Sequence, residues 1–233
     1  MTSSGGPRPD VAVPPAVAAI ADGRQVRVVW ENQLGGLTCE VNAGSDRWFV
    51  KWLPVTSGTD LTGEAVRLSW AQPFTPVPPL ISQGSDGSGS WLVTAAIPGQ
   101  NAASSRWKAE PQIAVRAIGE GLRSMHESLP VNRCPFSWSA DDRLAETPPV
   151  DQLVVCHGDS CAPNTLLTDD GRWSAHVDLG ALGTADRWAD LAIATWNVTL
   201  NYGAGWENLL LDAYGVALDA ERSRYYRLLG RCY

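Results

Sequence analysis

The sequence predicts an α+β chain of two lobes, a small β-rich first lobe and a larger, mainly helical second lobe. Three observations favour this division. Strand-like alternation fills residues 25–54 around a Gly-bearing turn, whereas the two longest helical periods, Gln112–Leu129 and Asp186–Leu200, come later in the chain. Between them, the pair Pro98-Gly99 ends the apolar strand Trp91–Ile97. We therefore expect a loose tail with a short helix at 1–22, a first lobe at 23–97 and a second lobe at 98–233.

The composition indicates a folded chain that is not suited to nucleic acid. With 233 residues, of which 44% are hydrophobic, the chain is large enough to bury a core. Its formal net charge of −7 argues against a nucleic-acid partner, because binding to a phosphate backbone depends on clustered Lys and Arg. An acidic surface suits a small cationic ligand better.

The cysteines and the N-terminal residues give no sign of export. The five cysteines include no CxxC pair and no zinc-like spacing, so neither a disulfide framework nor a structural zinc is expected. The N-terminal residues lack a charged region followed by an apolar core, and no run approaches the roughly 18 apolar residues of a membrane span. We expect a cytoplasmic chain without a membrane partner, either a monomer or a dimer.

The first lobe is expected to contain three strands, a helix and a further strand. The strands Gln25–Glu31 and Arg47–Leu53 flank a turn and a strand at 32–41. A helix follows over Asp60–Gln72, where apolar residues recur at helical spacing until Pro73.

The second lobe is expected to combine helices with three short strands. Its elements are a helix at 112–129, strands at 153–155, 164–167 and 174–177, and helices at 186–200 and 206–214.

The segment with the most chemical information runs from Cys156 to Asn164 and continues at 176–180. Phosphoryl transfer needs a group that orients the attacking hydroxyl, ligands for a magnesium ion and a cation on the phosphates. Asp159 offers the first of these, and Asn164 and Asp178 offer oxygen ligands of the kind that Mg²⁺ prefers. Each of the three taken alone would more often cap a turn or a helix, but their occurrence together favours phosphoryl transfer.

A rival interpretation uses some of the same residues. His157 and Asp159 are two positions apart, as are His176 and Asp178, so on extended chain each pair faces one way. The four side chains could then form a nitrogen and carboxylate metal site of a metallohydrolase. This interpretation ranks second, because it gives no purpose to Asn164.

Lys51 is the candidate for the cation on the phosphates. Strand alternation places Lys51 on one face with the bulky neighbours Phe49 and Leu53, where a lysine without a partner is unusual. Glu64, in the following helix, is the natural ion-pair partner. An edge lysine that discourages aggregation is the alternative for Lys51, and a surface helix glutamate is the alternative for Glu64.

Taken in order, these residues resemble the aminoglycoside and antibiotic phosphotransferases, a family with the bilobal protein-kinase-like fold. The resemblance spans Val26–Leu229 and is strongest over Cys156–Asn164 and His176–Leu191. It implies that Asp159 is the catalytic aspartate and that Asn164 and Asp178 hold Mg²⁺.

The resemblance also implies a nucleotide site. Lys51 and Glu64 would grip the phosphates of ATP, or of GTP, and the nucleotide would lie between the lobes under the turn that contains Gly35 and Gly36. Its base would reach backbone groups of the linker, at Thr94, Ala95, Ala96 and Ile97.

The implied acceptor is a 3'- or 3''-type hydroxyl of an aminoglycoside or a related aminocyclitol. Asp186, Asp190 and Glu207 would attract such a polycation. Three features depart from the family pattern: the hairpin turn Leu34–Thr38 is not of the family's Ser-Gly-Ala type, Ala181 follows Asp-x-Gly where the strongest resistance enzymes have Arg, and the stretch 138–153 is short. An endogenous amino sugar or amino alcohol therefore stays open as acceptor, and a non-catalytic nucleotide-binding module is the third alternative.

Overall fold

The computed structural model describes residues 11–43, 46–138 and 147–230, which form two compact units. The first unit contains residues up to 70 together with 78–96, and the second contains 71–77 together with 97–233. The sequence places 71–77 in the first lobe, whereas the structure groups these residues with the second unit. The amide of His176 donates to the carbonyl of Pro76, and the Arg133 guanidinium stacks on the Phe74 ring, so the proline-rich connection packs within the second unit.

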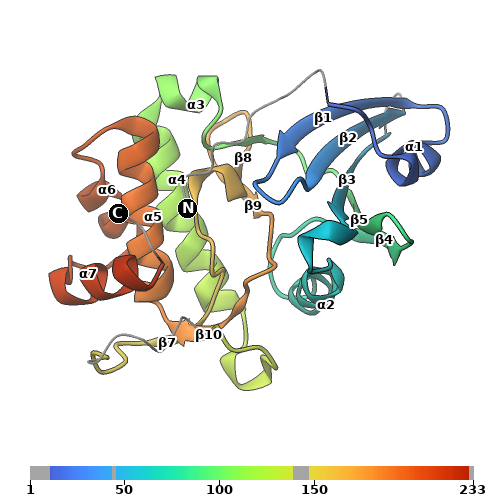
Figure 1. Cartoon of the computed structure of the whole chain (residues 1–233). Helices are drawn as coiled ribbons and strands as arrows, with labels where there is room; N and C mark the ends of the chain where they lie inside the picture. Colours follow the sequence, from blue (N-terminus) through green and yellow to red (C-terminus); the bar gives the residue numbers. More distant parts are fainter. Residues whose placement is uncertain (1–10, 44–45, 139–146, 231–233) are drawn as a thin grey trace. The chain divides into compact units, whose positions relative to one another are not determined.

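The first unit is a five-stranded antiparallel sheet with two helices (Figure 1). The strand order is β1-β2-β3-β5-β4. The elements are α1 (Pro15–Ala21), β1 (Gln25–Glu31), β2 (Leu37–Ala43), β3 (Asp46–Pro54), the 3-10 turn η1 (Val55–Ser57), α2 (Thr62–Ala71), β4 (Leu80–Ser85) and β5 (Gly89–Ala95).

The alternation in β3 divides the unit into two apolar layers, as the sequence predicts. Val50 faces one layer, which β1, β2 and β5 share with the buried side of α1. Leu53 faces the other layer, with Leu61, which precedes α2, and Ala65 of α2. Because side chains two apart on a strand share a face, Lys51 lies on the α2 side of the sheet.

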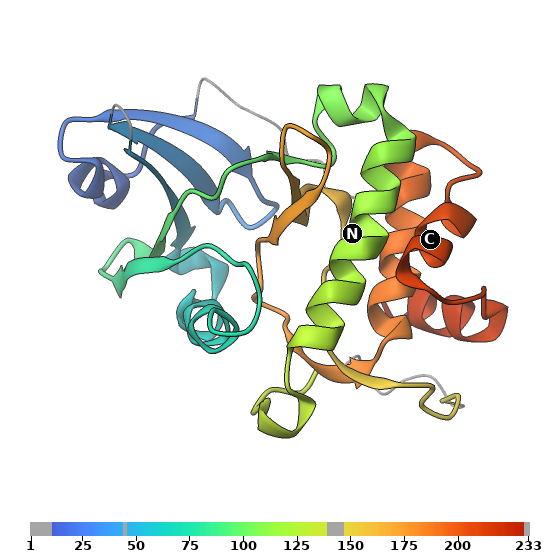
Figure 2. The same ribbon diagram turned by 180° about the vertical axis from the view of Figure 1, so that it is seen from behind.

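The second unit is mainly helical, with two small sheets of order β10-β7 and β6-β8-β9. Figure 2 shows the long helix α4 beside the helices of the C-terminal part. The elements are β6 (Gln100–Asn101), α3 (Ser105–Ala109), α4 (Pro111–Ser128), η2 (Val131–Arg133), β7 (Leu153–Cys156), η3 (Ala162–Asn164), β8 (Thr165–Leu167), β9 (Trp173–His176), β10 (Gly183–Asp186), α5 (Trp188–Tyr202), α6 (Glu207–Tyr214) and α7 (Ala220–Leu229).

One predicted boundary in this unit is wrong. The sequence starts a helix at Asp186, but this residue ends β10, and α5 begins at Trp188. The reason is tertiary pairing: Gly183 to Asp186 pair antiparallel with β7, from Cys156 to Leu153. A four-residue strand gives too short an alternation to be found in sequence.

The core of this unit forms where α4, α5 and α6 pack around β7. Fully buried members include Ile118 and Leu122 of α4, Leu191 of α5 and Leu210 of α6. None of the helices in the described ranges is long and apolar enough to cross a membrane.

Gly119 permits the close approach of α4 to α6, which gives a stability prediction. A Cβ at this position would lie 2.4 Å from the carbonyl oxygen of Leu210. Alanine normally favours a helix over glycine by about 1 kcal/mol, but Gly119→Ala should destabilise the protein by about 1–3 kcal/mol because the helices must separate. The measurement is the urea midpoint. Gly63→Ala is the control, since a Cβ there meets only the end of the long Arg67 side chain, at 3.1 Å; equal effects of the two substitutions would contradict the packing argument.

Candidate active site

The loop between β7 and β8 places Asp159 and Asn164 in direct contact. The Asn164 side-chain amide nitrogen donates to the Asp159 carbonyl oxygen at 2.9 Å and to its carboxylate Oδ2 at 3.1 Å. These bonds fix the orientation of the amide, so that Oδ1 of Asn164 is the atom left for another partner. Asp159 itself is exposed. The pair therefore presents a carboxylate to solvent and an amide oxygen as a potential metal ligand.

Asp178 follows β9 and is joined to the same loop through its neighbour. The amide of Val177 donates to the carbonyl oxygen of Asn164 at 3.0 Å. Asp178 is exposed and has a φ of 64°, a left-handed backbone that is uncommon for a residue with a side chain. Such backbone strain persists where the surrounding structure enforces it, and it gathers at functional sites.

His157 braces the two segments. Its Nε2 lies 2.9 Å from the carbonyl oxygen of Val177, and its Nδ1 lies 3.2 Å from the amide nitrogen of Asp159. The carbonyl can only accept and the amide can only donate, so the ring is neutral with its proton on Nε2. The imidazole thus connects Asp159, the candidate catalytic residue, with Val177, which directly precedes the candidate metal ligand Asp178.

The rival metal site is not formed in the part of the chain that the structure describes. Both nitrogens of His157 are engaged, and no close metal-ligand grouping there contains His157, Asp159, His176 and Asp178. His176 packs edge-on against His157 and is fully buried, and this burial holds the pKa of His176 well below the ordinary 6.5. The metallohydrolase interpretation is therefore wrong on geometry.

The backbone at Gly158 requires a residue without a side chain. Its φ is 85°, and a Cβ there would lie 2.3 Å from the carbonyl oxygen of Ala181. Any other residue would both strain the backbone and push away the segment after Asp178.

Asp190 is the buried anchor of the loop rather than a substrate residue. Its carboxylate accepts from the amides of His157 at 2.6 Å and Gly158 at 2.9 Å, and it lies 3.0 Å from Nε2 of His126. Burial by itself raises the pKa of Asp190, but the hydrogen bonds from His126 and from the Gly158 amide lower it below the ordinary 3.8. A fully buried carboxylate with these partners cannot meet a soluble polycation, so the prediction for Asp190 is wrong.

The other two predicted substrate carboxylates also have protein partners. Asp186 is buried and its carboxylate accepts from the amides of Asp151 and Trp188, the first residue of α5, so its predicted role in substrate attraction is wrong as well. Glu207 is partly exposed and pairs with Arg227 at 3.0 Å. A role for Glu207 toward substrate stays a prediction.

His126 is a residue that the sequence analysis missed. Together with Cys156 and Asp190 it forms a grouping whose ligand atoms lie within 4.8 Å of one another. No lone pair of His126 is free for a metal, because Nδ1 bonds the Tyr214 hydroxyl at 2.8 Å and Nε2 bonds Asp190. The available signal was its spacing: His126 follows Leu122 by four positions, on the buried stripe of α4.

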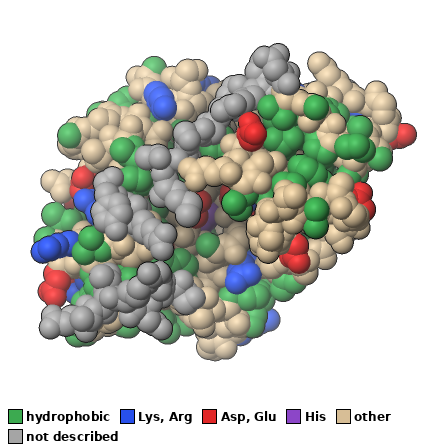
Figure 3. Space-filling view, in the orientation of Figure 1, with side chains coloured by type: hydrophobic (Ala, Val, Ile, Leu, Met, Phe, Trp, Pro, Cys, Tyr) green, Lys and Arg blue, Asp and Glu red, His purple; other side chains and the backbone are tan. Residues whose placement is uncertain are grey.

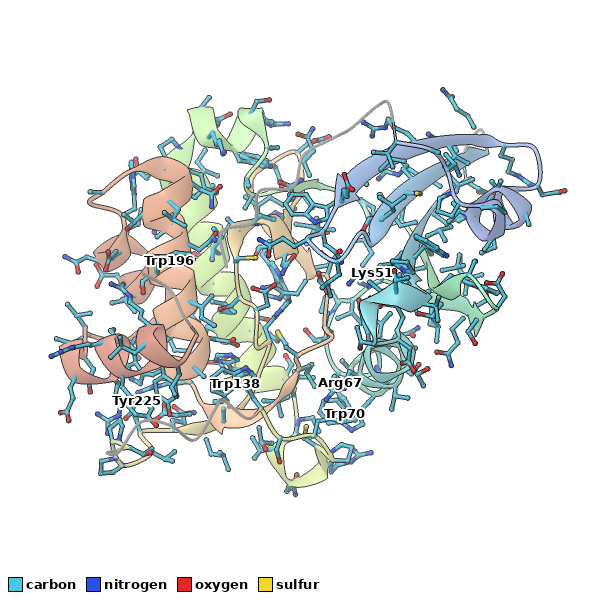
Figure 4. All side chains as sticks on the ribbon, in the orientation of Figure 1. Lys51, Arg67, Trp70, Trp138, Trp196 and Tyr225 are labelled. Atoms are coloured by element: carbon cyan, nitrogen blue, oxygen red, sulfur yellow. The ribbon has the colours of Figure 1, made fainter. Side chains whose placement is uncertain are left out.

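In the first unit, β3 and α2 bring Lys51 and Glu64 together. Lys51 Nζ lies 2.7 Å from a Glu64 carboxylate oxygen, and the side chains are 25% and 10% exposed. Lys51 is labelled in Figure 4, on β3. The expected ion pair is present, and its grip on phosphates stays a prediction.

The turn with the two predicted phosphate-binding glycines is closed by a side chain. Oδ1 of Asn32 accepts from the amides of Leu34 at 2.9 Å and Gly36 at 2.8 Å, and the amide of Gly35 donates to the Asn32 carbonyl. Phosphate contacts by Gly35 and Gly36 therefore require Asn32 to release these amides, and they stay a prediction.

Recognition of the nucleotide base by the linker residues Thr94, Ala96 and Ile97 also stays a prediction. The amide of Ala96 donates to the Arg47 carbonyl at 3.0 Å, and Thr94 pairs with Phe49 in the sheet. Because the Ala96 amide already donates to Arg47, other backbone groups of these residues would have to bind the base.

Figure 3 shows the side chains of one face of the molecule, coloured by type. On the face drawn in Figure 3, Lys and Arg side chains are scattered among acidic and hydrophobic ones and form no continuous stripe.

The fold and the loop geometry define a class: a kinase-like phosphotransferase. A model described as "Phosphotransferase enzyme family" matches residues 137–227. The chain is 35% identical over 219 residues to an aminoglycoside 3'-phosphotransferase of Streptomyces fradiae, covering 76% of this chain and 81% of the relative.

Solved structures agree. An aminoglycoside 3'-phosphotransferase of type VIII superposes with a TM-score of 0.77 at 29% identity, covering 94% of this chain and 98% of that one. A 3''-type aminoglycoside phosphotransferase from Streptomyces rimosus, in complex with ADP and streptomycin, superposes with a TM-score of 0.68 at 25% identity, with the same coverage. The chain belongs to the aminoglycoside phosphotransferase family and is an enzyme that transfers a phosphoryl group to an alcohol.

The buried charge of Asp190 predicts a specific pH dependence. Its pKa is lowered on folding, so the stability that it contributes is complete above about pH 4 and is lost as the pH falls through the folded pKa. Asp190→Asn should cost about 3 kcal/mol at pH 7, because it breaks a buried charged network, and the difference from the wild type should narrow below pH 4. Urea midpoints at pH 7, 5 and 3 measure this. Asp170→Asn, at an exposed carboxylate, is the control and should have little effect; a pH-independent gap for Asp190→Asn would contradict the assignment.

Proposed function

We propose that the protein uses ATP, or GTP, and Mg²⁺ to phosphorylate a hydroxyl of an aminoglycoside or a related aminocyclitol. The observation that carries the proposal is the contact between Asp159 and Asn164. It leaves an exposed carboxylate beside an amide oxygen fixed in orientation. The relatives named above, one of them in complex with ADP and streptomycin, support the nucleotide and the acceptor class.

The side chains present fit a magnesium ion. Oδ1 of Asn164 and the exposed carboxylate of Asp178 are oxygen donors, and Mg²⁺ prefers oxygen ligands and completes its shell with water and phosphate. When bound, the ion would neutralise charge on the phosphates.

Asp159 orients the acceptor hydroxyl and takes its proton. The attacking oxygen forms a bond to the γ-phosphorus while the bond from that phosphorus to the leaving oxygen of the nucleoside diphosphate breaks, and the hydroxyl proton passes to a carboxylate oxygen of Asp159. Lys51, aligned by Glu64, adds positive charge to the phosphates. Catalysis of this kind is largely positioning and electrostatics.

Ala181 favours a second candidate acceptor. At this place the strongest resistance enzymes have Arg, so an endogenous amino sugar or amino alcohol is the alternative substrate, and the 3'- or 3''-type position depends on the same region. Because ATP is a cytoplasmic metabolite, we expect the enzyme to act in the cytoplasm on a small cationic substrate.

The proposal is tested by ADP release coupled to a colour change, with Mg-ATP or Mg-GTP and a panel of kanamycin, neomycin, streptomycin and amino sugars. Asp159→Asn should lower kcat by about 100- to 10,000-fold, the usual contribution of general acid–base catalysis, while Mg-ADP binding persists. Turnover with amino sugars alone would select the second candidate. Full activity of Asp159→Asn would refute the role of this carboxylate, and Mg-ADP binding without turnover on any acceptor would favour a non-catalytic module.

A separate prediction concerns the Lys51–Glu64 pair. Lys51→Met should reduce kcat/KM for the nucleotide by about 10- to 100-fold, since a hydrogen bond to a charged group contributes about 1.5–3 kcal/mol. Glu64→Gln keeps a hydrogen-bond acceptor and should have a smaller effect in the same direction. Arg67→Met, on the same helix as Glu64, serves as the control for general loss of a cation and should leave kcat/KM within about twofold.

A further inference from the structure

The metal-binding half of the loop begins with a buried amide that its own turn cannot satisfy. The 3-10 turn η3 starts at Ala162, which is 1% exposed, and no side chain of the turn caps it. The amides at the start of a helical turn lack partners within the turn. Pro163 has no N–H, and the amide of Asn164 donates to the Cys161 carbonyl. The Ala162 amide is therefore the donor that needs an acceptor from elsewhere.

Asn197 of α5 supplies this acceptor. Its Oδ1 lies 2.8 Å from the Ala162 amide nitrogen, and Asn197 is only 8% exposed. Asn201, one turn further along α5, donates from Nδ2 to the same Oδ1 at 2.9 Å and to the Asn197 carbonyl at 3.0 Å. Two donors converge on one atom, so the orientation of the Asn197 amide is fixed and Oδ1 is identified as the acceptor.

The position of Asn197 on α5 links it to the anchor of the other half of the loop. Asn197 follows Asp190 by seven residues, two turns along the same helix face. Asp190 binds the amides of His157 and Gly158, before Asp159, whereas Asn197 binds the amide of Ala162, two residues before Asn164. The helix α5 thus holds the loop at both ends. Asp190 holds the end that carries Asp159, the proposed catalytic residue, and Asn197 holds the end that carries Asn164, the proposed metal ligand.

We propose that Asn197 is a positioning residue for the metal ligand Asn164, an inference that rests on the proposed function. Holding the Ala162 amide fixes the short turn whose last residue is Asn164, and so fixes where Oδ1 of Asn164 points. The side-chain oxygen, rather than the bulk of the residue, is the group that matters. Its removal weakens the divalent cation site and leaves Asp159 anchored by Asp190.

The test measures cation binding directly, by electron paramagnetic resonance of Mn²⁺ titrated into the full chain in the presence of ADP. Asn197→Leu removes the acceptor at similar volume, and it should raise the Mn²⁺ dissociation constant by about tenfold, the expected size for a displaced ligand. Asn197→Asp keeps an acceptor and should stay within about threefold of the wild type. Thr195→Val is the matched control, because Thr195 is also a buried polar residue of α5 but bonds Arg227 and the helix backbone; the Mn²⁺ affinity of this variant should be unchanged.

The outcomes separate the inference from the proposed function. Unchanged Mn²⁺ affinity in Asn197→Leu, or equal losses in the Leu and Asp variants, would overturn the positioning role while the wild-type site stands. A wild-type chain that binds no Mn²⁺ with ADP would contradict the proposed function and this inference with it. If Asn197→Leu is too unstable to titrate, Asn197→Ser, which shortens the side chain so that its oxygen cannot reach the amide, takes its place with the same expected loss.

Discussion

The loop that carries Asp159 depends on one buried carboxylate, that of Asp190. A charge removed from water is costly unless hydrogen bonds replace its hydration. Here the replacements are the amides of His157 and Gly158 and the imidazole of His126. The backbone on the N-terminal side of Asp159 must therefore take one path, because any other would leave the carboxylate, the amides or both without partners.

From that fixed point the rest of the site follows by short connections. His157 joins the Asp159 amide to the Val177 carbonyl, and the Asn164 carbonyl accepts from the Val177 amide, so three segments close on one another. The exposed groups, Asp159 and Asp178, are held by buried ones, and this division suits a reaction whose catalysis is mainly positioning. The buried face of α5 carries polar residues because they accept hydrogen bonds from the amides of this loop.

The sequence singles out the candidate reactive groups, whose chemical roles stay predictions, but it does not single out the groups that hold them. Asp159, Asn164 and Asp178 stand in a local pattern with a chemical meaning, and Lys51 and Glu64 follow from strand alternation and helix order. Asp186 and Asp190 were misinterpreted because an acidic residue near a helix start has the same appearance in sequence whether it faces solvent or caps a buried loop. His126 and Asn197 were missed because their partners lie far along the chain, so tertiary packing alone gives them their roles. For the same reason the sequence does not predict β10, which is defined by its pairing with β7.

The most direct test of this account is amide hydrogen exchange at His157 and Gly158 in the wild type and in Asp190→Ala. The account predicts strong protection of both amides in the wild type and exchange faster by at least about tenfold in the variant, as expected when a hydrogen bond to a charged group is lost. Amides in the middle of α4 should keep their protection, which would show that the change is local. Equal protection of the two loop amides in both proteins would contradict the claim that Asp190 holds the loop that carries Asp159.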